Sequence, residues 1–349
     1  MEKEALYNFD FQPFHDSFEI GPFQIIINDK HRNNVSLLSK HAKIICKNNV
    51  AQRISSEWNY NIYETATIKY FSKDIESPIM FRDIPNRNKV DDLIDFLSFL
   101  TGRRIFRENQ KQHIFSPYHL ESILEVDLKS TLNQHWKNLI QIEEQNLSNV
   151  LYSCILESQL QELMPQTAII NAAYDQLATS WFSKNKTSEK IDKEITEKIK
   201  KIITDSISDK NKVEDIIPRI DGLQSTSITK KQITFLKENE YCPSDDQLST
   251  NRIKILNKLR NAVIHKNDIK INPFKNKSWQ FQVEIAGNCA RIISNIVRHY
   301  LANEILRIDN ERLRCIKDNI YTFFKTGKWR NFDFMNASFI DFINENIKE

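Results

Sequence analysis

Three residues near the end of one helical pattern have side chains suited to chemistry at a phosphate. The stretch "KLRNAVIHKN" places Arg260 and Asn261 side by side and His265 four residues beyond Asn261. A histidine titrates near neutrality and can move a proton. A guanidinium can hold a phosphate by a fork of charge-assisted hydrogen bonds and oppose negative charge in a transition state. Asn261 could orient either the imidazole or the phosphate.

The helix that carries these residues is predicted to begin near Asp245, because Ser244 and Gln247 have capping-box spacing, and to end soon after His265. At 100° per residue, its apolar side chains form one stripe that should face a core: Leu248, Ile255, Leu256, Leu259, Ala262 and Val263. Asn261 and His265 share a face that points away from this stripe. Arg260 lies at the edge of the stripe. The alternative is that Arg260 and His265 are surface cations, which the helix dipole favours near a C-terminus.

The same residues resemble a known family. The sequence RNAVIH, from Arg260 to His265, matches the R-N-x-x-x-H form of the R-x4-6-H motif of HEPN domains. These domains are all-α bundles that include many metal-independent ribonucleases of toxin, CRISPR and anti-phage systems. In HEPN bundles the motif ends a late helix, and a loop and a long apolar helix follow it. The stretch "GNCARIISNIVRHYLANEIL" is similar to that last helix.

The resemblance covers roughly residues 140 to 310. Within it, "NAAYDQLATSWF" is similar to an A-x-E-x-L-like signature of an earlier helix, with Asp175 where the family usually has Glu, so Asp175 is a candidate for a supporting role. The part before it, including "VDDLIDFLSFLTGRRIF", is similar to the non-catalytic region of ApeA-like anti-phage proteins.

The resemblance implies a metal-independent endoribonuclease of a toxin or abortive-infection anti-phage system. RNA, with tRNA as one candidate, supplies its own nucleophile in the 2′-OH, so no cofactor and no metal are expected. HEPN nucleases pair two motifs, which implies a homodimer with a composite active site. Because unregulated RNA cleavage would harm the cell, we also expect a regulator, such as an activator of phage or cellular origin. The alternative is a non-catalytic HEPN module that binds nucleic acid or a partner.

The composition of the chain argues against several other classes of protein. The formal net charge is only +3, so any basic surface must be local. Five isolated glycines provide no Gly-rich loop for a P-loop or dinucleotide fold, and five widely spaced cysteines fit reduced buried thiols better than disulfides or zinc ligands. No apolar run has the length of a signal peptide or of a membrane span. We therefore expect a cytoplasmic protein with no membrane partner.

The fold class predicted is α+β: a β-rich N-terminal domain followed by an all-α HEPN-like bundle. The proposed divisions are 1–115, a sensory or regulatory domain; 116–310, the helical bundle; and 311–349, a C-terminal helical tail. Strands are predicted at "FQIIIND", "HAKIICK" and "NIYETATIKYF", because their β-branched and aromatic residues suit a pleated surface. A helix is predicted from about Val90, with a stop at Thr101-Gly102. The stretch "SEKIDKEITEKIKKIITDSI" is predicted to be an outer helix, with its isoleucines on one side.

A basic stretch within "RRIFRENQK" is the last candidate. Arg103, Arg104 and Arg107 could guide an RNA backbone toward the bundle, and Lys266 next to the motif is a further candidate for RNA contact. Alternating side chains on an edge strand explain the three arginines equally well, since a charge run is usually a solvated face.

Overall fold

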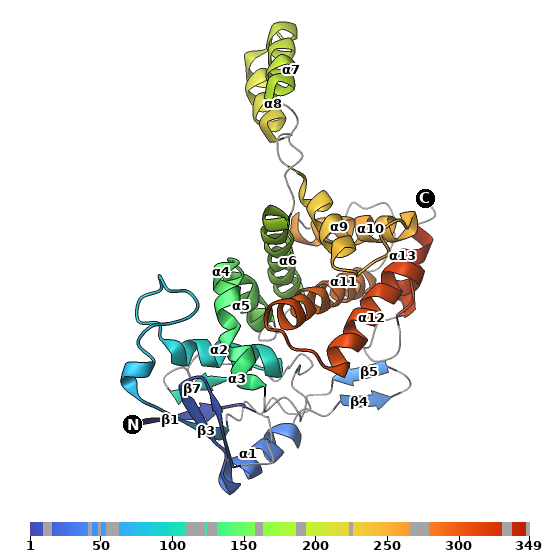
Figure 1. Cartoon of the computed structure of the whole chain (residues 1–349). Coiled ribbons are helices and arrows are strands. Elements are labelled where there is room, and N and C mark those ends of the chain that lie inside the picture. Colours follow the sequence, from blue (N-terminus) through green and yellow to red (C-terminus); the bar gives the residue numbers. More distant parts are fainter. Residues whose placement is uncertain are drawn as a thin grey trace.

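The computed structural model describes the backbone of most of the chain. The described residues are 1–9, 16–40, 44–47, 50–53, 63–108, 123, 131–157, 163–185, 193–222, 226–265, 279–329 and 337–346. For the motif residues 260–265 the backbone is described and the side chains are not. Figure 1 shows a small sheet near the N-terminus and helices through the remainder, which confirms a mixed α+β fold.

A five-stranded antiparallel sheet forms the N-terminal part, in the order β2-β3-β6-β1-β7. Its strands are β1 Glu2–Tyr7, β2 Ser17–Ile20, β3 Phe23–Ile26, β6 Glu64–Tyr70 and β7 Phe106–Arg107. On β3, Phe23 and Ile25 are buried and alternate with half-buried residues, as in a strand with one face on a core. β2 and β3 turn at Gly21, where φ is 55° and a Cβ would overlap the Trp136 ring. Only glycine fits this turn.

Strands occur at all three predicted places. β3 and β6 belong to the five-stranded sheet, whereas β4 Ile44–Lys47 pairs with β5 Val50–Arg53 in a separate ribbon. The helix α1 Asp29–Lys40 lies between β3 and β4 and was not predicted.

The helix predicted around Val90 is confirmed as α2 Lys89–Thr101. Asn88 and Asp91 form a capping box at its start, and Gly102 ends it in the left-handed conformation with a φ of 66°. Almost every residue of α2 is buried, because this helix lies between the sheet and the bundle and packs against α5 Ser148–Glu157.

After residue 131, all the secondary structure of the described residues is helical. Besides α5, the helices there are α3 Leu132–Lys137, α4 Leu139–Glu144, α6 Leu163–Asn185, α7 Lys193–Ser206, α8 Lys210–Gly222, α9 Ile228–Glu238, α10 Gln247–His265, α11 Trp279–His299, α12 Glu311–Thr326 and α13 Ala337–Asn346. A π-helical segment, Tyr300–Ile305, continues α11. Helix α6 packs against α5, α9, α10 and α11 and is the centre of the bundle.

Buried apolar side chains form one continuous core that runs from Leu6 in the sheet to Ile343 in α13. Polar contacts cross it as well: Arg298 of α11 donates to the carbonyl oxygen of Phe99 in α2 over 3.3 Å. The domain boundaries at 115 and 310 stay predictions, but side chains from both sides of each boundary share this core. Among the described residues, no helix combines the length and the apolar character needed to cross a membrane.

Candidate functional site

Helix α10 carries the candidate motif, and its start differs by two residues from the prediction. The helix begins at Gln247, and the residue before it, Asp246, accepts hydrogen bonds from the backbone N–H groups of Leu248 (3.1 Å) and Ser249 (3.0 Å). The hydrogen bonds with Ser249 lower the pKa of the Asp246 carboxyl. The cap is therefore an aspartate, and the predicted pairing of Ser244 with Gln247 is wrong.

The buried face of α10 also differs from the predicted stripe. Leu256 and Leu259 are buried as predicted, but Leu248 is 50% exposed, and Ser249, Arg252 and Ile253 are buried instead. The reason lies in α12, whose C-terminal carbonyl groups are capped by α10. Arg252 Nη1 donates to the carbonyl oxygens of Phe324 (2.6 Å) and Lys325 (3.1 Å), and Ser249 Oγ donates to that of Phe324 (2.8 Å). A buried arginine that satisfies helix-end carbonyls thus fixes the rotation of α10.

This capping contact makes a stability prediction. Changing Arg252 to Met removes the donors while keeping much of the side-chain volume, so buried carbonyl groups lose their partners. We expect the free energy of unfolding to fall by about 1–3 kcal/mol, as measured by urea denaturation. Lys254→Ala, on the exposed side of the same helix, is the matched control and should have little effect. Equal effects of the two variants would contradict the capping role.

Helical spacing extends the two sides of α10 to the motif. Ser249, Ile253 and Leu256 lie along the buried side, and the next position on that line is 260. Lys254 and Lys258 are exposed, and their line continues to positions 261 and 265. The spacing thus places positions 261 and 265 together on the line of the exposed lysines, and position 260 on the line of the buried residues. That the Arg260 side chain lies at the edge of the apolar stripe stays a prediction. The chemical roles of the three side chains stay predictions, because the structure describes only their backbone.

Asp175 lies on α6 and is joined to α9. Its Oδ1 accepts a hydrogen bond of 2.6 Å from Nε2 of Gln232, a residue with no exposed surface. This contact ties α9 to α6 within the bundle that positions α10 and gives Asp175 a structural task, whereas its supporting role in catalysis stays a prediction.

The three arginines of the basic stretch are engaged inside the N-terminal part. Arg103 is buried, Arg104 Nη1 lies 3.8 Å from Asp95 Oδ1, and Arg107 pairs with Asp91 (3.1 Å) and Glu4 (3.6 Å). This geometry favours the structural alternative over RNA contact, since Arg103 is buried and the guanidinium groups of Arg104 and Arg107 already face carboxylates. Lys266 lies outside the described residues.

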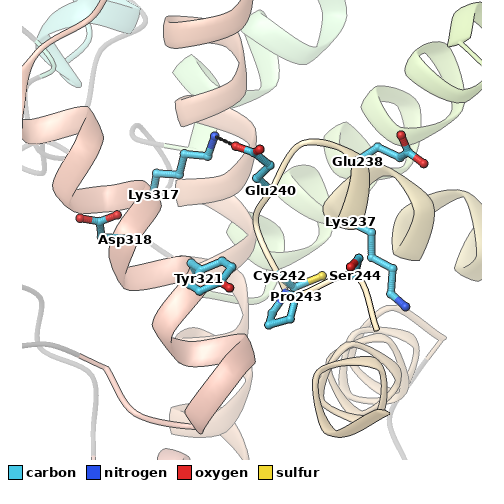
Figure 2. A pocket seen from close by; sticks show the side chains of 9 residues that line it. All are labelled: Lys237, Glu238, Glu240, Cys242, Pro243, Ser244, Lys317, Asp318 and Tyr321. Atoms are coloured by element: carbon cyan, nitrogen blue, oxygen red, sulfur yellow. Dashed lines mark hydrogen bonds and ion pairs between the residues drawn. The ribbon is translucent and has the colours of Figure 1, made fainter. Parts of the chain in front are cut away.

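A pocket lies beside the other end of α10 (Figure 2). It has a volume of about 930 Å³ and is formed between the connection from α9 to α10 and the outer side of α12. Its lining residues are Lys237, Glu238, Glu240, Cys242, Pro243, Ser244, Lys317, Asp318 and Tyr321. An α-helix rises about 1.5 Å per residue, so the 19 residues of α10 separate this pocket from His265. The sequence did not predict this pocket, because its lining residues carry charges of both signs and form no cluster of one sign. Lys317, for example, pairs with Glu240 at 3.4 Å.

A buried tyrosine and histidine lie next to this pocket. The hydroxyl of Tyr241 is 2.7 Å from Nδ1 of His299, and both residues are nearly inaccessible. Burial lowers the pKa of His299 to about 4, so the imidazole is neutral at pH 7 and Nδ1 accepts from the hydroxyl. We infer that His299 has a structural role here and is a poor candidate for proton exchange with a substrate.

A second buried polar group joins α5 to α11. Glu157, at the end of α5, accepts a hydrogen bond of 2.7 Å from Ser294 Oγ, and burial raises its pKa to about 7. Arg298 and Arg291 oppose this shift without cancelling it.

The raised pKa of Glu157 has a consequence for stability. An ordinary glutamate in the unfolded chain releases its proton near pH 4.5, whereas the folded protein keeps this proton to about pH 7. Stability contributed by this group therefore falls as the pH rises through that window, by up to about 3 kcal/mol. The glutamine of Glu157→Gln cannot ionise. As the pH is raised from 4.5 to about 7, the urea denaturation midpoint of this variant should therefore fall less than that of the wild type. Parallel pH profiles of the two proteins would contradict this assignment.

Comparison with known proteins adds no relative: no family model matches the chain, and neither the curated proteins nor the solved structures gave a match.

Proposed function

We propose that the chain is a metal-independent endoribonuclease of the HEPN type that acts in a toxin or abortive-infection anti-phage system. The observation that carries the proposal is the setting of the RNAVIH sequence. It forms the end of α10, a helix packed against α6, α9, α11 and α12, and the long α11 follows it in the chain. This order of motif helix and long apolar helix is the one that the motif requires in a HEPN bundle.

The exposed side of α10 supports contact with a polyanion. Lys254 and Lys258 are exposed on the line that leads to positions 261 and 265. The C-terminal end of a helix also carries partial negative charge, which favours cations such as a protonated histidine there. A strip of lysines that ends at a histidine can draw an RNA backbone along the helix and present a phosphate to the imidazole.

The reaction needs only groups that these residues and RNA provide. A base removes the proton of the 2′-OH, the 2′ oxygen attacks the adjacent phosphorus, and the 5′ oxygen leaves with a proton from an acid. The products are a 2′,3′-cyclic phosphate and a 5′-OH. His265 serves as base or acid, and Asn261 orients the imidazole or the phosphate. Arg260, one position or about 100° around the helix from Asn261, binds the phosphate oxygens with a side chain long enough to bend round toward that face. Because one copy has one such imidazole, we propose that a second copy supplies the other proton-transfer group in a composite site.

The test is cleavage of mixed cellular RNA and tRNA in the presence of EDTA, with the His265→Ala protein purified in parallel as the blank. Fragments with cyclic phosphate or 3′-phosphate ends, formed by the wild type alone, would support the proposal. Fragments with 5′-phosphate ends that require added Mg²⁺ would overturn it. RNA binding by both proteins without cleavage by either would favour the non-catalytic HEPN module, with a regulator as the next component to add.

A further inference from the structure

A buried amide on α10 has a hydrogen-bond donor without a partner. Asn257 is 6% exposed, and no group of the described residues accepts a hydrogen bond from its Nδ2. A buried donor that lacks an acceptor costs stability, so such groups are rare in folded proteins and each has a cause. Asn257 lies one helical turn before the candidate motif, whose side chains come next on the same helix.

Asn257 lies on the border between the buried and the exposed sides of α10. Ile253, one turn earlier, is buried, whereas Lys254 is exposed. At 100° per residue, position 260 lies about 60° from Asn257 toward the buried side, and position 261 lies about 40° from it toward the exposed side. The amide is therefore placed between the positions of Arg260 and Asn261, one turn away from both.

One residue within a helical turn of Asn257 has a side chain that can accept its hydrogen bond. Side chains three and four residues apart are neighbours on a helix, and these positions hold Ile253, Lys254, Arg260 and Asn261. The isoleucine is apolar, and lysine and arginine side chains have donors but no acceptor. Asn261 has a side-chain oxygen and is the acceptor that the helix offers.

The same helix already contains an amide pair with this spacing. Gln247 Nε2 donates to Asn251 Oδ1 over 3.0 Å, four residues further along α10. Helical side chains lean toward the N-terminus, so a side chain at position 261 covers the turn that carries Asn257. A hydrogen bond from Asn257 to Asn261 would repeat the first pair closer to the end of the helix.

We propose that Asn257 is a positioning residue of the ribonuclease site and that its Nδ2 donates to the side-chain oxygen of Asn261. This inference rests on the ribonuclease proposal and narrows it. With its oxygen engaged, Asn261 has only its N–H2 group to offer the site. That donor suits the phosphate, whose oxygens accept hydrogen bonds, and it leaves the imidazole of His265 free to transfer protons.

The first test is a double-mutant cycle of stability, which requires no activity. Asn261→Ala removes the acceptor and leaves the donor of Asn257 buried without a partner, whereas Asn257→Leu removes the donor at nearly constant volume. Asn261→Ala should therefore lower the midpoint of urea denaturation more in the wild type than in the Asn257→Leu background. The higher helix propensity of alanine acts in both backgrounds and cancels. Equal shifts in the two backgrounds would overturn the proposal.

The second test measures RNA cleavage in EDTA by the same proteins. Asn257→Leu should lower kcat/KM roughly tenfold, the effect of one hydrogen bond, and should cause no further fall when added to Asn261→Ala. Asn251→Leu, the same substitution at a half-buried position earlier in α10, is the matched control and should keep the wild-type value.

The outcomes separate this inference from the ribonuclease proposal. Cleavage by the wild type with full activity of Asn257→Leu, or with a further fall in the double variant, would overturn the positioning role and leave the ribonuclease standing. A wild type that does not cleave RNA would contradict the ribonuclease proposal and with it the positioning role. The stability cycle would then still show whether the two amides pair.

Discussion

Alanine in place of His265 is expected to lower kcat for RNA cleavage by a factor of about 10²–10⁴, the usual contribution of a group that transfers a proton in the transition state. In the proposed mechanism the imidazole acts only on the reacting atoms, so KM should change little. Initial rates on a defined single-stranded RNA, measured at several RNA concentrations in EDTA, separate the two constants.

Lys258→Ala is the matched comparison, because Lys258 is exposed on the line of α10 that leads to position 265. An ammonium group that contacts the RNA backbone binds the ground state and the transition state alike. We therefore expect a rise in KM that diminishes at higher salt, with kcat unchanged. A His265→Ala protein that keeps the kcat of the wild type would remove this residue from the mechanism, even if its KM had risen.

The parts of the fold that follow from local patterns could be predicted from the sequence. The runs rich in β-branched and aromatic residues that became β3 and β6, and the apolar helix α2 with its glycine stop, are of this kind, because residue preference and a C-terminal glycine are local signals. β1 was missed: it is acidic and amphipathic at its start, and its strand conformation depends on pairing with β6, some sixty residues later in the chain. Long-range pairing overrides weak local preference.

The rotation of α10 shows a different limit of prediction. A helical wheel ranks positions by hydrophobicity and therefore placed Leu248 in the core and left Arg252 out of the predicted stripe. The structure buries Arg252 because the carbonyl groups at the end of α12, more than seventy residues away in the chain, need donors. The pairs Tyr241–His299 and Glu157–Ser294 are likewise invisible in local sequence, since their partners come from different helices. The motif itself could be found because all of its residues belong to one helix.

The second large effect is expected at Asp92, which holds a loop of the N-terminal part against α2. Its side chain is fully buried, accepts hydrogen bonds from the backbone N–H groups of Ile79 and Met80, and pairs with Arg87 Nη2 at 2.8 Å. In Asp92→Ala these donors lose the carboxylate that accepts their hydrogen bonds, although Arg87 still pairs with Asp95 at 2.8 Å. Breaking a buried ion pair costs about 3–5 kcal/mol. Asp83→Ala, an exposed aspartate in the same loop, should change the free energy of unfolding by less than about 0.5 kcal/mol.

The same variant also shows whether the N-terminal part unfolds separately from the bundle. Because α2 packs on α5 and shares a continuous core with α11, the destabilisation should shift one cooperative transition of the entire chain. Far-ultraviolet circular dichroism, dominated by the helices after residue 131, and tryptophan fluorescence should then give the same shifted midpoint. Two transitions, with only the smaller one shifted, would instead mean that a boundary near residue 115 separates two folding units. In that case α10 and its motif would keep their stability when the sheet unfolds, and the N-terminal part could regulate the bundle by local unfolding alone.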